Sequence, residues 1–332
     1  MKPRSSVRMA DVAQAAGVAP ATVSRAINEP DKVAPETRAQ VEAAVRKLGY
    51  VPDRTASSLA SSRSKIVGAI VPTLANVWFA ETMEGLAAEL GKAGYQLMLS
   101  QSSYVARTEA GLIDGFLGRR VDALVLTGAL RDTATRAKLR AVKLPVVETW
   151  DLPARPVDMA VGFSNQEVGA EVARRLLKAG RRRIAFLGAD EHRSLMRRTG
   201  FERELQAAGR PLIASEFTQP PSTIAAGRVL MEQLVAAHPD VDAVFCGNDF
   251  LAIGALMWAR AHGWDVPGRV AVVGFSDLPV AEATWPPLTT VKVRGAEMGR
   301  RAGEMVLARL RGEEPARKSV DVGFEFVERS TL

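Results

Sequence analysis

Residues 9–28 read MADVAQAAGVAPATVSRAIN, and this stretch decides the fold of the first part of the chain. The apolar residues of Met9–Ala16 recur on one face at helical spacing, which predicts a short helix. Gly17 can adopt a positive φ and so ends that helix, and Pro20 fits the first turn of a second one. Two short helices on either side of a glycine turn are typical of a helix-turn-helix unit.

The sequence that follows predicts a third, supporting helix. Pro35 opens it, Glu36–Leu48 carries an apolar face at helical spacing, and Gly49 closes it. Many small helical bundles share this arrangement, so the periodicity alone leaves a function other than DNA binding open.

The excess positive charge of the chain is concentrated in this helical segment. The 332 residues carry 44 Lys and Arg against 37 Asp and Glu, a net charge of +7. Residues 1–63 contain ten basic and six acidic residues, a balance of +4, which leaves +3 for the rest of the chain. A compact basic unit ahead of a nearly neutral body suggests a nucleic-acid-binding head on a larger domain. A solvated basic tail is the alternative.

The composition also limits the kinds of site and location. A single cysteine, Cys246, rules out a disulfide framework and any multi-cysteine metal site. Three histidines leave little room for a histidine-rich metal centre, so we expect neither a metal nor a cofactor. No apolar run is long enough to span a membrane, and the N-terminus lacks the apolar region of a signal peptide. We therefore expect a cytoplasmic protein.

From Lys65 onward, strand-like and helix-like segments alternate. Strands without polar alternation indicate sheets covered on both faces, and the alternation predicts parallel strands with right-handed crossovers. Two such halves suggest two similar subdomains, although strand counting alone leaves an eight-fold barrel open. The expected strands are Ile66–Val71, Tyr95–Leu99, Ala123–Leu126, Val146–Glu148, Met159–Phe163, Ile184–Gly188, Ala243–Cys246 and Ala271–Phe275, and the expected helices lie near Phe79–Ala93, Thr108–Arg119, Thr133–Ala141, Gln166–Ala179, Leu195–Ala208, Thr223–Ala237 and Phe250–Gly263.

Longer segments resemble one known family. The runs DVAQAAGVAPATVSRAIN (11–28) and VAPETRAQVEAAVRKLGYVPDRTASSLAS (33–61) resemble the head and hinge of the lactose-repressor (LacI/GalR) family. Segments that resemble the core of that family follow in order and at the expected spacing, so the resemblance covers nearly the whole chain and argues against a barrel. They are VGAIVPTLANVWFAETMEGLAAELGKAGYQLML (67–99), RRRIAFLGAD (181–190), VDAVFCGNDFLAIGAL (241–256), VAVVGFSDLPVAEATWPPLTTV (270–291) and AGEMVLARLRGE (302–313).

The resemblance implies an α/β protein with an N-terminal all-α head. A helix-turn-helix DNA-binding domain over residues 1–54 would be followed by a hinge helix or linker, 55–64. Residues 65–332 would form a periplasmic-binding-protein-like core of parallel sheets that binds an effector and dimerises. The chain would cross between the two subdomains near Phe163, Thr290 and Ser319, so that the N-subdomain comprises about 65–162 and 292–318 and the C-subdomain about 163–290 and 319–332.

The resemblance also implies DNA contacts in the head and hinge. In the family the second helix lies in the major groove and reads base edges from its first residues. Arg25 is the strongest candidate, because a guanidinium fork matches guanine O6 and N7. In the family a hydroxyl often stands at the positions of Ala19 and Ala34, where it caps a helix and contacts a phosphate. An alanine cannot make either contact. The positions carried over are Pro20, Ala21 and Arg25 as base readers, Thr22, Ser24, Asn28, Thr37 and Tyr50 as phosphate contacts, and Leu59 as the hinge leucine that enters the minor groove.

Some of these positions have plainer interpretations. Thr22 and Ser24 could be ordinary helix-surface residues, and Leu59 could be an incidental leucine in the polar linker TASSLASS (55–62).

Polar and aromatic side chains gather after the expected strands, where open α/β sheets bind ligands. Aromatic rings that stack on a sugar, with amides and carboxylates for its hydroxyls, suit a sugar site. Arg197 stands where the family has an arginine that holds ligand oxygens, and it suits a carboxylate or a phosphate. The candidate effector contacts are Asn76, Trp78, Phe79, Gln101, Ser103, Tyr104, Glu148, Trp150, Arg197, Asn248, Asp249, Ser276 and Asp277.

Several of these candidates also have structural alternatives. Trp78 and Phe79 could be core residues. Asn248 could cap its helix, and Asp249 could serve the helix dipole. Ser276 stands where many relatives of the family carry an acidic residue, which weakens the case for a ligand contact there.

Three short segments, LSQSSY (99–104), LPVVETWD (144–151) and VDMAVGFSN (157–165), look most like the gluconate-operon repressors of the family. We therefore expect a homodimeric repressor that binds double-stranded operator DNA and is released by a sugar acid such as gluconate or a derivative. The dimer face is expected on Phe79–Ala93 and Thr108–Arg119.

Other functions stay open at this point. The effector could be another sugar or a phosphorylated metabolite, or it could act as a co-repressor. A sugar-acid enzyme with Cys246 as nucleophile is a more remote alternative, because the sequence contains no G-x-S-x-G, Walker or H-E-x-x-H motif. We expect no catalytic residues.

Overall fold

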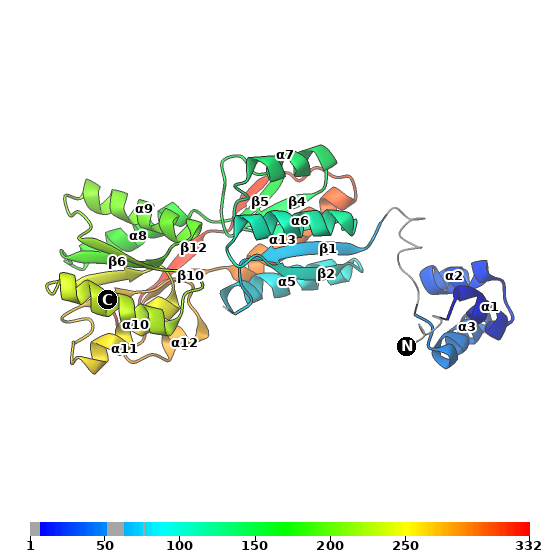
Figure 1. Cartoon of the computed structure of the whole chain (residues 1–332), viewed down its shortest axis with the longest axis horizontal. Coiled ribbons are helices and arrows are strands. Elements are labelled where there is room, and N and C mark those ends of the chain that lie inside the picture. The colour runs from blue at the N-terminus through cyan, green and yellow to red at the C-terminus, as the bar shows by residue number, and fades with distance from the viewer. Residues whose placement is uncertain (1–6, 52–62, 76) are drawn as a thin grey trace. The chain divides into compact units, whose positions relative to one another are not determined.

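The computed structural model describes residues 7–51, 63–75 and 77–332. The chain forms two compact units, Met1–Ser64 and Lys65–Leu332, and each is described by itself. The first unit contains the helical head and the second contains the α/β core (Figure 1).

The head is a bundle of three helices around a small apolar core. The helices are α1 (Met9–Ala16), α2 (Pro20–Asn28) and α3 (Pro35–Leu48), with one 3-10 turn, η1 (Pro30–Lys32), before α3. Gly17 has a φ of 68°, the left-handed conformation that ends α1. The predicted helices are therefore confirmed. The buried residues of the head are Val12, Ala13, Val23, Ala26, Val41, Ala44 and Tyr50.

The first lobe of the core is a six-stranded parallel sheet in the order β11-β5-β4-β3-β1-β2. Ala69 of β1 packs in the cluster that includes α5 and α13, whereas Ile70 packs with Ile113 of α6 and Leu139 of α7. Both faces are thus covered, which explains the apolar strands. The elements are β1 (Ile66–Val71), η2 (Val77–Phe79), α5 (Ala80–Lys92), β2 (Gln96–Gln101), α6 (Ala106–Gly118), β3 (Ala123–Thr127), α7 (Thr133–Val142), β4 (Val146–Thr149), β5 (Met159–Gly162), α13 (Gly295–Leu310) and β11 (Ser319–Asp321).

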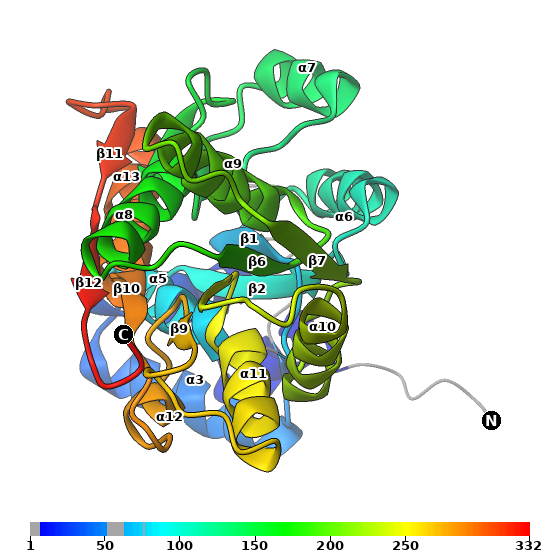
Figure 2. The same ribbon diagram turned by 90° about the vertical axis from the view of Figure 1, so that its left-hand side faces the viewer.

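The second lobe is a four-stranded parallel sheet in the order β7-β6-β8-β9. Figure 2 shows α8 and α9 on one side of this sheet and α10 and α11 on the other. The parallel two-lobed α/β architecture predicted from the sequence is therefore confirmed. The elements are α8 (Asn165–Lys178), β6 (Ile184–Ala189), α9 (His192–Ala207), β7 (Ala214–Thr218), α10 (Ile224–Ala237), β8 (Ala243–Cys246), α11 (Asp249–Ala261), β9 (Ala271–Val273) and α12 (Pro279–Glu282).

Two antiparallel strands, β10 (Thr290–Val293) and β12 (Phe324–Val327), lie between the lobes (Figure 1). The last crossing comes later than the expected position near Ser319. That residue begins β11, which pairs with β5 in the first lobe, with Ser319 opposite Ala160. The chain leaves the first lobe only after Asp321, because β11 completes the edge of that sheet.

Candidate functional site

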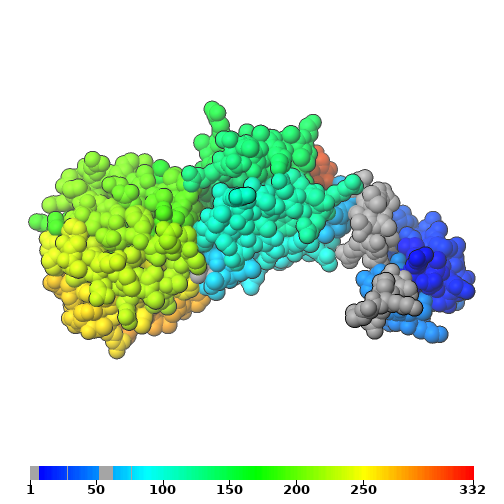
Figure 3. Space-filling model, viewed as in Figure 1, coloured from blue at the N-terminus to red at the C-terminus, as the bar shows by residue number. Residues whose placement is uncertain are grey.

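A cavity lies between the two lobes, where strands of both sheets end. Its walls come from the segments after β1, β2 and β4 in the first lobe and after β6, β7, β8 and β9 in the second. It measures about 30 Å³, room for little more than water, and Figure 3 shows the lobes in contact. A six-carbon ligand therefore needs movement of the lining side chains or of the lobes. The lining residues are Trp78, Phe79, Tyr104, Trp150, Ala189, Glu191, Arg193, Arg197, Ser222, Asn248, Phe275 and Ser276.

Arg197 is fixed on the second-lobe side of this cavity. Its Nη1 donates to Asn165 Oδ1 (2.6 Å) and its Nη2 to the carbonyl oxygen of Gly247 (3.0 Å). The guanidinium lies 4.0 Å from the ring centroid of Phe275. Burial lowers the pKa of Arg197 to about 10, so the group stays charged near neutral pH. Its Nε is buried without a hydrogen-bond partner among the described residues, which leaves a donor for a ligand oxygen.

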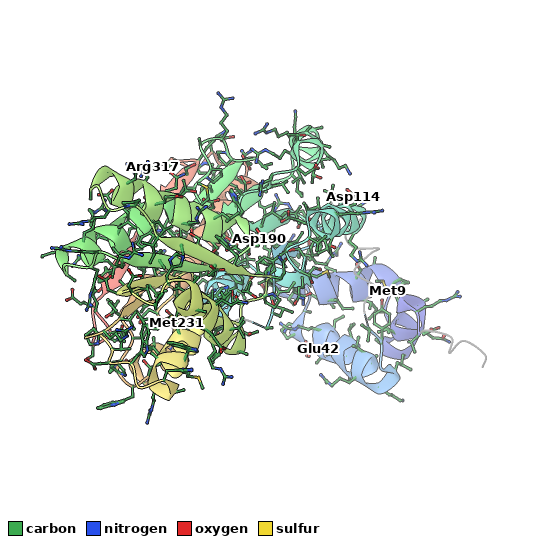
Figure 4. The ribbon with its side chains drawn as sticks, turned by 60° about the vertical axis from the view of Figure 1, so that its left-hand side comes forward. Met9, Glu42, Asp114, Asp190, Met231 and Arg317 are labelled. Carbon is green, nitrogen blue, oxygen red and sulfur yellow. The ribbon has the colours of Figure 1, made fainter. Side chains whose placement is uncertain are left out.

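Arg193 lies one turn earlier on α9 and reaches the first lobe. Its Nη1 donates to the carbonyl oxygen of Thr127 at the end of β3 (3.1 Å), and its guanidinium lies 5.3 Å from the ring centroid of Phe79. Glu191 caps α9 by accepting from backbone N–H groups of its first turn. The Glu191 carboxylate also lies 3.5 Å from Arg193 Nη2 and 3.7 Å from Arg197 Nη2. Asp190, labelled in Figure 4, precedes this capping residue.

Aromatic rings form the first-lobe wall. The ring centroids of Phe79 and Trp150 are 5.0 Å apart, and those of Trp78 and Phe79 are 5.9 Å apart. Trp78 also meets Phe250 of α11, in the second lobe, at 5.5 Å. Trp150 Nε1 donates to Thr82 Oγ1 (3.0 Å), which fixes the indole. Phe79 is therefore both a buried core residue and a lining residue.

Backbone strain is concentrated at the same place. Ser103, Tyr104, Trp150, Ser276 and Asp277 have φ values of 54°, 61°, 66°, 121° and 54°, all in or near the left-handed region. Residues other than glycine rarely adopt such angles, and those that do cluster at ligand-binding sites.

Polar side chains complete the lining. Burial raises the pKa of Tyr104 to about 12, so its hydroxyl remains a proton donor. Asn248 caps α11 by accepting from the backbone N–H of Leu251 (3.1 Å), and its Nδ2 donates to Ser222 Oγ (2.9 Å). Asn248 thus has the capping role that the sequence left open while it also lines the cavity.

Three acidic candidates do not line the cavity. Glu148 has no exposed surface, and its carboxylate accepts from backbone N–H groups of the loops beside β4. Burial raises the pKa of Glu148. Asp249 is equally buried and accepts from the Thr290 hydroxyl (2.6 Å). Asp277 pairs with Arg329 (2.7 Å). In this arrangement of the lobes the three carboxylates have structural partners within the protein, and their contact with an effector stays a prediction.

Two further candidates lie beside the cavity rather than in its lining. Gln101 accepts from the backbone N–H of Leu74 (3.0 Å) and donates to Ser103 Oγ (3.1 Å), so these side chains hold the loop that carries Tyr104. Asn76 lies outside the described residues.

Sequence reasoning missed several lining residues. These include Arg193 and Glu191. A signal existed, since Arg193 and Arg197 are four residues apart and share one helix face. The segment RSLMRR (193–198) contains three arginines, however, and spacing alone did not show which of them face the cavity. The missed lining residues are Ala189, Glu191, Arg193, Ser222 and Phe275.

The second head helix presents a polar surface with one exposed arginine. Pro20, Ala21 and Arg25 are exposed on α2, and Thr22 and Ser24 are half-buried. These are the positions that the resemblance places against DNA.

The remaining candidate DNA contacts differ in where they lie in the head. Thr37 is half-buried in the first turn of α3, Asn28 ends α2, and Tyr50 is buried in the head core rather than projecting from it. Leu59 lies outside the described residues.

Two helices of the head begin after an alanine, whose methyl side chain cannot accept a capping hydrogen bond. Ala19 and Ala34 are the N-cap residues of α2 and α3, and neither makes a side-chain cap bond.

The described residues contain no group of three or more His, Cys, Asp or Glu side chains placed to hold a metal ion. Burial, and Asp249 to a lesser degree, raise the pKa of Cys246 in β8, which keeps the thiol protonated and poorly nucleophilic. None of the helices in the described ranges is both long and apolar enough to cross a membrane.

A helix-turn-helix head and a two-lobed core with an inter-lobe cavity define a ligand-responsive, DNA-binding regulator. Residues 8–53 match the model of bacterial regulatory proteins of the lacI family, and residues 173–332 match a periplasmic binding protein-like domain. The chain is 40% identical to the HTH-type transcriptional regulator GntR of Pseudomonas aeruginosa, over 97% of this chain and 94% of that protein. The chain belongs to the lacI family of bacterial regulatory proteins.

Solved structures agree with this assignment. A LacI-family transcriptional regulator from Silicibacter pomeroyi superimposes with a TM-score of 0.92 at 32% identity, over 98% of this chain and 99% of that one. The transcription regulator GntR from Chromobacterium violaceum does so with a TM-score of 0.77 at 38% identity, over 80% of this chain and 98% of that one. These relatives are transcriptional regulators, and the present chain is an effector-responsive, DNA-binding transcriptional regulator of the same family.

Proposed function

We propose that this regulator is a repressor released from its operator by a sugar acid, gluconate or a close derivative. The observation that carries the proposal is the pair of guanidinium groups, Arg193 and Arg197, beside an aromatic wall. Guanidinium forks bind carboxylates in two-point fashion, and aromatic rings cover the apolar edges of a sugar. The resemblance of residues 99–104, 144–151 and 157–165 to gluconate-operon repressors supports the same class of effector.

In this proposal the effector acts by changing the arrangement of the lobes. A sugar acid needs more room than the present cavity offers, and in this proposal it gains that room by favouring a different arrangement of the lobes. The first lobe begins at Lys65, directly after the hinge segment 55–64. Movement of this lobe would therefore displace the hinge segment. If two chains bind the operator together, displacement of their two hinge segments would weaken DNA binding.

We also propose a homodimer, which would place two heads on the half-sites of a near-palindromic operator. Exposed apolar side chains support this assembly, because their burial in an interface would be favourable. Met98 and Leu99 are exposed on β2, the edge strand of the first sheet beside α5, and Met257 and Trp285 are exposed on the second lobe. The surface at β2 adjoins one of the helices expected at the dimer face.

The direct test combines a ligand screen with DNA release. Thermal melts with gluconate, 2-ketogluconate, 6-phosphogluconate and glucose would identify the effector, because a ligand at 100 times its Kd stabilises a protein by about 2.7 kcal/mol. The same ligand should release the protein from a duplex that it has selected from random-sequence DNA, measured by fluorescence anisotropy. Tighter DNA binding would make the ligand a co-repressor, and product formation would favour the enzyme alternative.

A further inference from the structure

The charged side chains that line the inter-lobe cavity carry one net positive charge. Among the lining residues they are Arg193, Arg197 and Glu191. Glu191 is committed to capping α9, and its carboxylate lies between the two guanidinium groups. The lining itself therefore carries one positive charge in a site shielded from water, and this charge attracts an anionic ligand.

Three carboxylates lie close to the lining residues. Asp151 is buried, with its carboxylate 3.9 Å from His192 Nε2, and Glu109 is close enough to Arg193 for the two charges to interact. Asp249 is buried and follows the lining residue Asn248 in the chain. A second negative charge on the ligand would face these carboxylates, so the surroundings favour one negative charge rather than two.

The two arginines differ in how they are held. Arg197 donates hydrogen bonds to Asn165 and Gly247, which belong to its own lobe. Arg193 instead donates across the cleft to the carbonyl oxygen of Thr127. The next residue, Gly128, has a φ of 105°, and a Cβ there would lie 3.0 Å from Arg193 Nη1, so the glycine leaves room for the guanidinium.

Arg193 also retains hydrogen-bonding capacity. A guanidinium has five N–H donors. The hydrogen bond to Thr127 and the ion pair with Glu191 use only part of that set. A carboxylate in the cleft could therefore bind the free donors or draw the group away from Thr127.

We propose that Arg193 is the specificity-determining residue that makes this cleft selective for a singly charged acid. It distinguishes the acid from the neutral polyol of the same skeleton, and the surrounding carboxylates disfavour a phosphate ester. The carboxylate of the ligand replaces the Thr127 carbonyl as the partner of Arg193, so that ligand charge opens the contact between the lobes. This inference rests on the proposed sugar-acid function and names the residue that selects the acid over a neutral ligand.

The test compares ligands that differ in charge on variants that differ at one position. Binding of gluconate, glucitol and 6-phosphogluconate to the full chain is followed by tryptophan emission, since Trp78 and Trp150 line the cavity. We expect R193Q to weaken gluconate roughly tenfold to a hundredfold, the range for a lost charge-assisted pair, while glucitol affinity stays the same. R193K keeps the charge and should retain a preference for gluconate over glucitol.

R198Q is the matched control. Arg198 lies on the same helix outside the lining, donates to Ser215 Oγ (3.0 Å) and pairs with Glu202 (3.2 Å). Its substitution should leave the gluconate-to-glucitol ratio unchanged.

The outcomes separate the two proposals. Equal weakening of gluconate and glucitol by R193Q would make Arg193 a lobe contact without a role in specificity, which overturns the inference. Tighter binding of 6-phosphogluconate than of gluconate to the wild type would overturn the preference for one charge. If none of the acids binds the wild type although DNA binding persists, the proposed sugar-acid function itself fails.

Discussion

Asp249 is a carboxylate without exposed surface at the start of α11. It accepts from the Thr290 hydroxyl (2.6 Å) and from the backbone N–H of Leu278 (2.8 Å), and these bonds tie α11 to the segments after β9 and at β10. Burial raises the pKa of Asp249 to about 6, above the value of a free carboxyl. The folded protein therefore holds a proton that the unfolded chain releases at lower pH.

This raised pKa predicts a pH-dependent stability. The contribution is fully present below about pH 4 and is lost as pH rises through about 6, by up to about 3 kcal/mol. D249N removes the titration, so the melting temperature of the variant relative to the wild type should rise between pH 5 and pH 8. Circular dichroism melts of both proteins across this range provide the measurement. A constant difference at every pH would show that the Asp249 pKa is not raised.

Arg25 is the exposed basic residue in the first two turns of α2. R25A should cost about 1–3 kcal/mol at one operator position and relax the base preference there. Binding to duplexes that differ by single base pairs measures this effect. R38A is the control, because Arg38 is exposed on α3 and paired with Glu42 (2.8 Å). Uniform loss of affinity on all sequences would instead make Arg25 a phosphate contact.

At the residue scale, the sequence predicted where the candidate residues lie better than which way they point. Glu148 does follow an apolar run, yet its carboxylate is used inside the first lobe. Arg193 donates across the cleft to the carbonyl oxygen of Thr127, which is 66 residues away in the chain. Local spacing contains no information on such a contact, because it depends on how two separately folded lobes meet.

At the scale of elements, the packing of α8 against α9 positions both cavity arginines. Gly169 on α8 and Gly200 on α9 allow the two backbones to touch, and a Cβ on Gly200 would overlap the carbonyl oxygen of Gln166. The helices are thus held at a separation that only glycine permits at these two positions.

G200A should force α9 away from α8 and displace Arg193 and Arg197. Overpacking of this kind costs about 1–3 kcal/mol, and ligand affinity should fall with stability. G111A is the matched control on α6, since a Cβ there meets no atom within 4 Å and alanine is the better helix former. Thermal melts and ligand titrations of both variants test this prediction. Unchanged stability in G200A would mean that the helices repack without strain.

The same scale shows which elements the sequence could predict. The core strands are apolar because helices cover both faces of each sheet, and this pattern is visible in one dimension. β7 was not predicted, because this half-exposed edge strand reads ASEFT and lacks an apolar run. Helix α13 carries three glycines and five charged residues in its sixteen positions, GAEMGRRAGEMVLARL, which obscures its apolar face.

At the scale of the whole molecule, contacts between the lobes hold the cleft nearly closed. Arg193 bonds to Thr127, Trp78 meets Phe250, and Asn165 Nδ2 donates to the carbonyl oxygen of Trp150 (3.1 Å). A ligand that needs more room must bind a different lobe arrangement more tightly than this one, or it shifts nothing.

If the operator selects one lobe arrangement and the effector another, their affinities must be linked. Operator DNA should weaken gluconate binding by the same factor by which gluconate weakens operator binding, within the usual range of about 5- to 150-fold. Titrating the full chain with gluconate, with and without the operator duplex, gives one factor, and titrating with the duplex at zero and saturating gluconate gives the other. R25A serves as the control, since a head with weakened operator binding should need a higher duplex concentration to produce the same change in gluconate affinity. A wild-type gluconate affinity that is indifferent to the operator would show that the cleft and the head are not coupled.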